Sequence, residues 1–232
     1  MNDTEHIISH FNIAGSVAEV KPLGNGLIND TFKVTTHGDA PDYVLQRINN
    51  SIFTDVDLLQ HNIDAVTTHI RRKLEAEGAV DIDRKVLQFV ASDTGKSYWQ
   101  DSDGSYWRMS VFIPRAFTHE TVNPEYSYYA GKAFGNFEAM LADMSEELGE
   151  SIPDFHNMEL RRRQLHDALK EDRAGRAAGV KDFVAQLEQY ADEMCRAQQL
   201  HREGRLPKRI CHCDTKVNNI LFDKDGNVLC VI

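Results

Sequence analysis

The chain changes from a mainly strand-like to a mainly helical hydrophobic pattern at Pro114, and this change limits which folds it can adopt. Before Pro114, short runs rich in strand-forming residues (VAEVKPL, TFKVTT and DYVLQRI) are separated by the turn signals GNG and HGDAP. Further strands are expected in KVLQFVA, and in SYWQ and SYWRMSVFI around the turn DSDG. The first half of the chain therefore predicts an antiparallel β-sheet.

One long amphipathic helix is expected within this strand-rich region. Apolar residues spaced three and four apart run through residues 56–74, which is the pattern of a helix with one buried face. Thr54 or Asp55 can cap its N-terminus, and Gly78 can end it. A second, short helix is expected over residues 3–14.

After Pro114 the chain becomes helical in composition and period, with few β-branched residues. Helices are expected over residues 123–149, 157–178 and 180–203. The arginine run Arg161–Arg163 is typical of a solvated helix face. The sequence thus predicts an α+β fold with a β-rich lobe (1–113), a helical lobe (114–232) and a cleft between them near residues 113–120.

The charge balance argues against one class of partner. The 232 residues include 36 Asp and Glu against 26 Lys and Arg, a net charge of −10, whereas a protein that coats nucleic acid needs a basic face. A few local cations can still bind a small anionic ligand. No apolar run approaches the ~18 residues of a membrane span, and the N-terminus shows no secretory signal. The few cysteines, all late in the chain, fit a reduced cytoplasmic setting. We therefore expect a cytoplasmic protein with no nucleic-acid or membrane partner.

The loop at residues 210–219 is the most informative segment, because it contains HCDTKVNN and precedes the apolar runs ILFD and VLCVI. The turn KDGN between those runs predicts a β-hairpin over residues 219–232. In such a loop Asp214 can accept a proton from a substrate hydroxyl, Asn219 can bind a divalent cation, and Lys216 can neutralise a phosphate. Phosphoryl transfer needs these groups and little covalent chemistry from the protein.

Single residues of this loop have plainer explanations. Asp and Asn often cap turns, and a lone histidine such as His212 is more often a hydrogen-bonded core residue than a catalyst. Cys211 and Cys213 flank that histidine, but their spacing fits no familiar zinc finger. The ordered spacing His-x-Asp-x-Lys-x-x-Asn before an apolar hairpin nevertheless favours catalysis.

This loop resembles the catalytic loop of the protein-kinase-like superfamily, His-Arg-Asp-x-Lys-x-x-Asn. It matches the aminoglycoside phosphotransferase form, His-Gly-Asp-x-x-x-x-Asn, except that Cys213 replaces the glycine. From about residue 20 to the end, the chain is also similar to bacterial N-acetylhexosamine 1-kinases, in LGNGLINDTFKV, YVLQRIN, SIF, GKAFGNFEAML, IPDFHN and LPKRICHCDTKVNNILFD. The resemblance implies a protein-kinase-like bilobal fold, with a helical lobe that is truncated in this chain.

The resemblance implies a role for each polar residue of the loop. Asp214 would be the base that accepts the proton of a sugar hydroxyl, and Lys216 would approach the γ-phosphate of ATP. Asn219 would bind Mg2+, and His212 would brace the loop.

The resemblance also places the nucleotide site in the β-rich lobe. Its residues would be Gly24, Asn25, Gly26, Asn29, Thr31, Gln46 or Arg47, Phe112 and Ile113. The glycine turn at residues 24–26 would cover the phosphates, with polar contacts beneath it, although GNG alone is equally typical of a hairpin. Backbone groups of residues 112–113 would bind adenine.

The chain departs from the protein-kinase pattern on the third strand, where a lysine holds the α- and β-phosphates. YVLQRIN has Gln46 in the most direct alignment and Arg47 beside it. Neighbouring strand residues point to opposite faces, so only one of the two can enter the cleft, and the sequence leaves both open. Asp64 in the long helix would be the partner of that residue.

The resemblance predicts an ATP- and Mg2+-dependent kinase that phosphorylates a small-molecule sugar, at the anomeric hydroxyl of an N-acetylhexosamine. A kinase of another alcohol (an aminoglycoside, choline, homoserine or methylthioribose) would share the same loop. A non-catalytic nucleotide-binding protein also stays open, because the strand lysine is missing. In the superfamily a magnesium-binding aspartate directly follows the strand written here as VLCVI, whereas this chain ends at Ile232. We therefore expect residues 1–232 alone to lack metal-dependent transfer.

Overall fold

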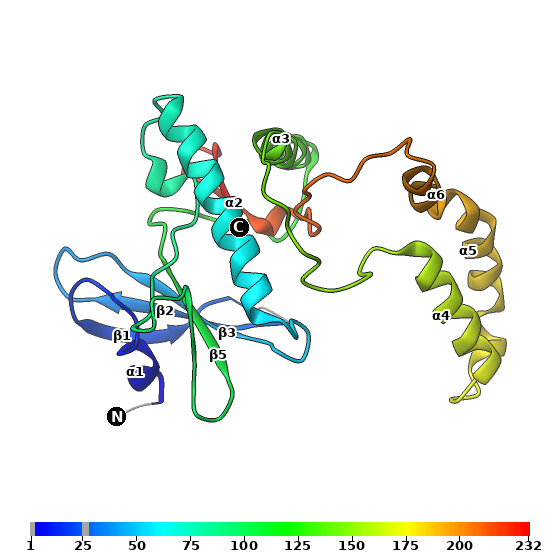
Figure 1. Ribbon diagram of the computed structural model, residues 1–232, viewed down its shortest axis with the longest axis horizontal. Coiled ribbons are helices and arrows are strands. Elements are labelled where there is room, and N and C mark those ends of the chain that lie inside the picture. Colours follow the sequence, from blue (N-terminus) through cyan, green and yellow to red (C-terminus); the bar gives the residue numbers. More distant parts are fainter. Residues whose placement is uncertain (1–2, 25–27) are drawn as a thin grey trace. The chain divides into compact units, whose positions relative to one another are not determined.

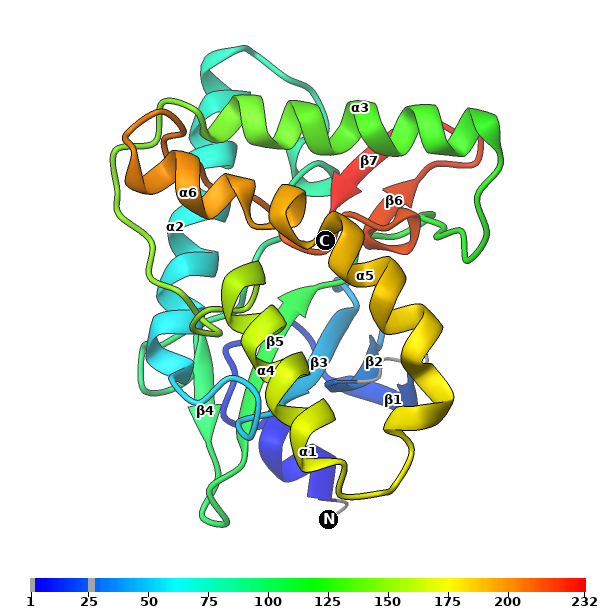
Figure 2. The same cartoon turned by 90° about the vertical axis from the view of Figure 1, so that its right-hand side faces the viewer.

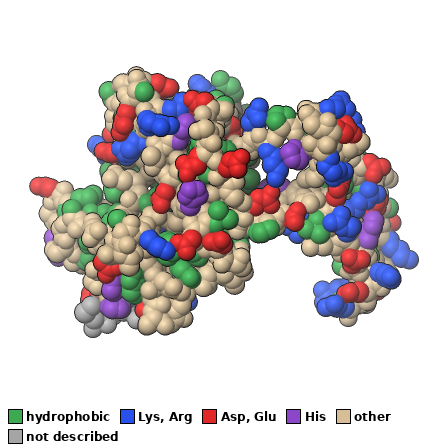
Figure 3. All heavy atoms as spheres, viewed as in Figure 1, with side chains coloured by type: hydrophobic (Ala, Val, Ile, Leu, Met, Phe, Trp, Pro, Cys, Tyr) green, Lys and Arg blue, Asp and Glu red, His purple; other side chains and the backbone are tan. Residues whose placement is uncertain are grey.

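The computed structural model describes residues 3–24 and 28–232 (Figures 1 and 2). They belong to two compact units: unit 1 comprises Met1–Ser151 and Ile210–Ile232, and unit 2 comprises Ile152–Arg209. Within the described ranges, every helix is too short or too polar to span a lipid bilayer. On the face shown in Figure 3, acidic and basic side chains are interspersed.

Unit 1 is built on a five-stranded antiparallel sheet with the strand order β1-β2-β3-β5-β4. Its strands are β1 (Val17–Pro22), β2 (Asp30–Thr36), β3 (Tyr43–Ile48), β4 (Tyr98–Gln100) and β5 (Tyr106–Val111). In the central pair, Leu45 lies opposite Met109 and Gln46 lies opposite Arg108. The antiparallel sheet predicted from the sequence is confirmed.

One predicted strand does not form. The segment KVLQFVA pairs with β5 only through an isolated bridge between Phe89 and Ser110. The backbone hydrogen bonds that join it to β5 run from Val90 N–H to Met109 O at 2.8 Å and from Val111 N–H to Gln88 O at 2.9 Å. Because β3 occupies one edge of β5 and β4 occupies part of the other, only a few residues of β5 are left for this segment to pair with. The prediction of a strand there is wrong.

Two helices cover the sheet: α1 (Asp3–Ile8) and α2 (Val56–Ala76). Figure 1 shows them on opposite sides of the strands. On the α1 side, the buried core consists of Ile7, Ile8, Phe11, Val34, Tyr43, Leu45, Val90 and Met109. On the α2 side, Val56 packs against Ile48 and Tyr98. Since side chains alternate along a strand, Leu45 belongs to the α1 face and Gln46 to the α2 face.

Helix α2 begins and ends as its sequence indicates. The side chain of Asp55 accepts a hydrogen bond from the backbone N–H of Leu58 at 2.9 Å, so Asp55, rather than Thr54, is the N-cap. Gly78 follows the helix with a φ of +67°, the left-handed conformation that commonly ends helices.

Helix α3 (Pro124–Leu141) supports the C-terminal hairpin, whose strands are β6 (Ile220–Phe222) and β7 (Val228–Val231). The buried residues between them are Ala133, Phe134, Val217, Ile220 and Phe222. The predicted hairpin is confirmed. Three short 3-10 turns complete the described elements: Ile82–Arg84, Ala177–Val180 and Val217–Asn219.

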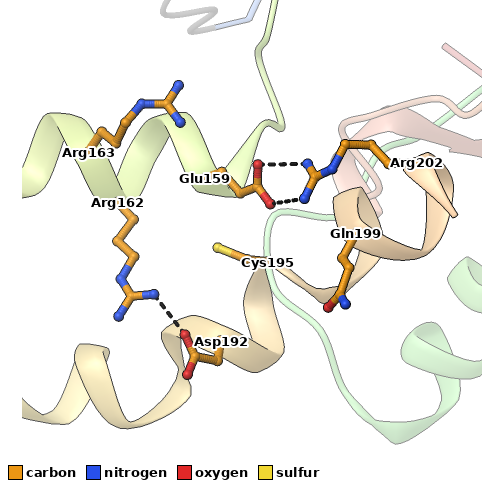
Figure 4. A pocket seen from close by; sticks show the side chains of 7 residues that line it. All are labelled: Glu159, Arg162, Arg163, Asp192, Cys195, Gln199 and Arg202. Carbon is orange, nitrogen blue, oxygen red and sulfur yellow. Dashed lines mark hydrogen bonds and ion pairs between the residues drawn. The ribbon is translucent and has the colours of Figure 1, made fainter.

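Unit 2 contains the helices α4 (Met158–Glu171), α5 (Lys181–Met194) and α6 (Arg196–Arg202). Ala191 is the only buried residue among the described residues 152–209, so charged contacts contribute much of the packing. Arg202 pairs with Glu159 at 2.8 Å, and Arg162 pairs with Asp192 at 2.8 Å (Figure 4). The arginine run was expected to be solvated, but its member Arg162 thus forms an ion pair within the unit.

Candidate active site

The loop at residues 210–219 is held in unit 1 at both of its ends. At its start, Ile210 packs among apolar residues of α2 and α3. At its end, Val217 is 6% exposed, and the backbone N–H of Ile232 donates to Asn219 O at 2.9 Å. An apolar frame therefore fixes a loop whose polar side chains stay exposed.

Asp214 is the centre of a charged hydrogen-bond network. Its Oδ2 accepts hydrogen bonds from Lys216 Nζ and Asn219 Nδ2, both at 2.9 Å. Burial alone would raise the pKa of Asp214, but the bonds from Lys216 and Asn219 outweigh it and lower this pKa below its ordinary value of 3.8. The carboxylate is therefore ionised at neutral pH. Among the described residues its Oδ1 has no hydrogen-bond donor, so that oxygen is free to accept a proton.

His212 uses both of its ring nitrogens within the protein. Nε2 donates to Ile232 O at 2.9 Å, and Nδ1 accepts from the backbone N–H of Asp214 at 3.3 Å. Its ring also packs against Phe134 and Phe137 of α3, with centroid distances of 5.2 and 5.7 Å. These contacts position the loop and leave no ring nitrogen for proton transfer.

Cys213 has a φ of +67°, in the left-handed region that glycine adopts most easily. This conformation turns the chain between His212 and Asp214, so that the side chains of these two residues contact different partners. It also explains why glycine suits this position in the aminoglycoside phosphotransferase pattern.

Asn219 offers one oxygen to a metal ion. Its Nδ2 donates to Asp214, whereas its Oδ1 has no donor in the part of the chain that the structure describes. Mg2+ prefers six oxygen ligands and usually takes one or two carboxylates besides phosphate oxygens. No group of three or more His, Cys, Asp and Glu side chains gathers into a metal site among the residues described. Asn219 thus fits Mg2+ only together with oxygens from a bound nucleotide.

The glycine turn expected over the phosphates is described only in part. Gly24 has a φ of +71°, which suits a tight turn, whereas Asn25 and Gly26 lie outside the described residues. Nearby, the side-chain oxygen of Asn29 accepts a hydrogen bond from the backbone N–H of Asn49 at 3.0 Å. Asn29 therefore fixes the chain before β2.

Gln46, and not Arg47, shares a face of the sheet with α2. Gln46 Nε2 donates to Thr31 Oγ1 at 3.1 Å, and its Oε1 accepts from Arg108 Nε at 2.9 Å. Arg47 lies on the opposite face, where its Nη2 donates to Ser105 Oγ at 3.0 Å. On this face of β3 a neutral amide thus stands where the most direct alignment with the kinase pattern would place the lysine.

Arg108 of β5 is the cation beside Gln46, and the motif spacing did not indicate it. Its Nη1 donates to Gln60 Oε1 of α2 at 3.1 Å. Burial lowers the pKa of Arg108 to about 10, with the negative charge of Asp64 acting in the opposite direction, so the guanidinium is charged at neutral pH. The available signal was a single charged residue inside the apolar run SYWRMSVFI.

Asp64 does not form the expected partnership with the third strand. Its Oδ2 instead accepts a hydrogen bond from Ser97 Oγ at 2.5 Å. Burial raises the pKa of Asp64, while the Ser97 hydrogen bond and the charges of His61 and Arg108 act against that rise.

The expected adenine-binding segment is partly occupied by the protein itself. The backbone N–H of Phe112 donates to Asp42 O at 2.8 Å, so it is not available to a base. Ile113 is 5% exposed, and its backbone groups have no hydrogen-bond partner among the described residues. The binding of adenine by this segment therefore stays a prediction.

The sheet, the helices and the charged loop define a protein of kinase-like fold. The model of the phosphotransferase enzyme family (APH) matches residues 19–232, and the chain belongs to this family.

The chain is similar to two solved structures and to one curated protein. The chain is 14% identical to spectinomycin phosphotransferase APH(9)-Ia in complex with ADP and spectinomycin, with a TM-score of 0.59 over 98% of this chain and 66% of that one. It is 15% identical to a thermostable mutant of aminoglycoside phosphotransferase APH(4)-Ia in a ternary complex with AMP-PNP and hygromycin B (TM-score 0.49, 100% of this chain and 70% of that one). The probable serine/threonine-protein kinase MARK-B of Dictyostelium discoideum is 33% identical over 78 residues, 28% of this chain and 11% of that protein.

The likeness to the spectinomycin enzyme confirms the protein-kinase-like bilobal α+β fold, and at 14% identity it shows the fold alone. The chain spans 66% of that enzyme and 11% of the curated kinase. None of these three proteins is an N-acetylhexosamine kinase, so the closer resemblance to those enzymes stays a prediction.

Proposed function

We propose that this chain supplies the nucleotide-binding and catalytic-loop residues of an ATP- and Mg2+-dependent cytoplasmic kinase that phosphorylates a hydroxyl group of a small molecule. The observation that carries the proposal is the Asp214 carboxylate, which Lys216 and Asn219 keep ionised while its Oδ1 stays unpaired among the described residues. Membership of the phosphotransferase family supports the same activity.

Each residue of the loop has a separate task in this proposal. Asp214 Oδ1 accepts the proton of the acceptor hydroxyl as the hydroxyl oxygen attacks the γ-phosphorus of ATP, and the bond from the γ-phosphorus to the β,γ-bridging oxygen breaks so that ADP leaves. Lys216, whose side chain is 54% exposed, offsets negative charge on the phosphoryl group in transfer. Asn219 Oδ1 would hold Mg2+, which when bound neutralises phosphate charge. His212 keeps the loop in place.

For the acceptor we propose the anomeric hydroxyl of an N-acetylhexosamine. The support is the sequence resemblance that runs from about residue 20 to the end of the chain. In this proposal residues 1–113 are the nucleotide-binding lobe and residues 114–232 belong to the lobe that binds the sugar.

A panel of acceptors tests the proposal. The full-length gene product would be assayed for ADP release from ATP and Mg2+ with two N-acetylhexosamines, an aminoglycoside, choline, homoserine and methylthioribose. We expect turnover with an N-acetylhexosamine and none without Mg2+. Turnover with another alcohol alone would remove the sugar but keep the kinase. Nucleotide binding without turnover on any acceptor would favour the non-catalytic alternative, which the neutral Gln46 on β3 also favours.

A further inference from the structure

A guanidinium with an unused donor lies at the centre of the polar cluster on the α2 face of the sheet. Arg108 donates Nε to Gln46 Oε1 at 2.9 Å and Nη1 to Gln60 Oε1 at 3.1 Å, and both acceptors are neutral amides. Its Nη2 has no acceptor among the residues that the structure describes. Arg108 is therefore a half-buried cation that the protein orients but does not neutralise by direct contact.

The one carboxylate that acts on Arg108 is used elsewhere. Asp64 influences the pKa of Arg108 through space, but its Oδ2 accepts from Ser97 at 2.5 Å, and no ion pair joins Asp64 to Arg108. Charges removed from water are normally paired, because burial without a partner costs free energy. An anionic ligand beside Arg108 would offset that cost.

The cluster continues to the expected phosphate turn. Thr31, Gln46 and Arg108 are neighbours in register across β2, β3 and β5. Gln46 joins the other two by hydrogen bonds through its amide nitrogen and oxygen. At the β2 end of this row, Thr31 O accepts from the backbone N–H of Leu23 at 2.8 Å, and Leu23 directly precedes Gly24. The row of polar side chains thus starts beside Leu23 and Gly24 and ends at the guanidinium.

We propose that Arg108 binds the polyphosphate of the nucleotide through its free Nη2, in the role that a lysine on β3 would otherwise fill. Gln46 and Gln60 are positioning residues, because their oxygens fix two sides of the guanidinium and leave the third for the ligand. A planar guanidinium suits phosphate oxygens, which accept parallel hydrogen bonds from it. This inference rests on the proposed function, which supplies the nucleotide.

Calorimetry with two ligands tests the assignment. The 232-residue chain and its Arg108→Met variant would be titrated with ADP and, separately, with adenosine. We expect Arg108→Met to weaken ADP binding about 10- to 100-fold, the effect of losing a hydrogen bond to a charged group. Adenosine lacks phosphates, so its affinity should change less than about twofold. Arg108→Lys keeps the charge and should restore part of the ADP affinity.

A matched control and a second variant keep the test decisive. Arg71→Met also removes a guanidinium from unit 1, one that pairs with Asp83 at 2.9 Å, and it should leave both affinities unchanged. If thermal unfolding shows that Arg108→Met does not fold, Arg108→Gln replaces it with the same expectation. Unchanged ADP binding, or equal weakening of ADP and adenosine, would overturn the role of Arg108 and leave the kinase proposal standing. A wild-type chain that binds neither ligand would overturn both.

Discussion

Replacing Asp214 with asparagine removes the proposed base and nearly keeps the shape of the side chain. In the full-length gene product, Asp214→Asn should lower kcat by about 10²- to 10⁴-fold, the usual loss when a positioned general base is removed. ADP affinity should stay within about twofold, because the base acts on the acceptor hydroxyl. Steady-state kinetics and calorimetry measure the two effects. The control is Asp225→Asn at the hairpin tip, which should keep normal turnover, and near-normal turnover in Asp214→Asn would show that another group is the base.

The left-handed backbone at Cys213 gives a second prediction for a single residue. A non-glycine residue at a φ of +67° costs about 1–2 kcal/mol, and glycine relieves this at an entropic cost of about 0.5–1 kcal/mol. Cys213→Gly should therefore raise the free energy of unfolding by roughly 0.5–1 kcal/mol.

Urea denaturation would measure this difference against two controls. Cys213→Ala keeps the strain and should show no such gain. Cys195→Gly lies where φ is −81° and should lose stability. A loss of stability in Cys213→Gly would mean that the cysteine side chain itself stabilises the loop.

Single residues also show what the sequence could not decide. The motif spacing alone singled out Asp214, Lys216 and Asn219, because a catalytic loop is a local feature of the chain. Which of Gln46 and Arg47 lies on the side of α2 depends on which face of β3 meets that helix. The alternation of side chains along the strand is compatible with either residue. Arg108 was missed because its partners come from β3 and α2, which are distant in sequence.

At the scale of elements, a buried histidine ties α2 to the end of α3. The Nε2 atom of His69 donates to Met140 O at 3.1 Å and to Asp143 Oδ1 at 3.2 Å. Its Nδ1 accepts from Arg72 Nη2 at 3.1 Å. His69→Ala would remove the donor to Met140 O, whereas Asp143 Oδ1 keeps its bond from Lys73 Nζ at 2.8 Å, so the free energy of unfolding should fall by about 1–3 kcal/mol. His61→Ala, at an exposed position of the same helix, is the control and should change it by less than about 0.5 kcal/mol. Equal losses in the two variants, measured by chemical denaturation, would contradict this role for His69.

The elements differ in how far the sequence could predict them. Helix α2 was predictable because its apolar period, its N-cap and its terminal glycine all agree within one stretch of chain. KVLQFVA has strand-like composition, yet whether it forms a ladder depends on how much of the edge of β5 is left by β4. This competition for the edge of β5 cannot be predicted from the sequence of KVLQFVA alone.

For the whole molecule, the sequence predicted a change from strands to helices but not the two compact units. The hairpin at residues 220–231 and α3 join the sheet in unit 1, because their apolar faces pack on each other and on α2. The lobe boundary at residue 113 stays a prediction. Compact units depend on which apolar faces meet, and that is settled by tertiary packing.

The two units should differ in local stability, because they bury very different amounts of apolar surface. Unit 2 has one buried residue, and α5 carries a stripe of exposed apolar side chains at helical spacing. These are Phe183, Leu187, Tyr190 and Met194, and the exposed Val180 directly precedes the helix. Regions with few buried contacts open more readily, so amides of α4 to α6 should exchange with deuterium at least about tenfold faster than those of β2, β3 and β5. Hydrogen exchange with mass spectrometry on the 232-residue chain measures this directly. Similar protection in both units would mean that the apolar stripe of α5 is covered in solution, and that unit 2 is stabilised by contacts outside its own helices.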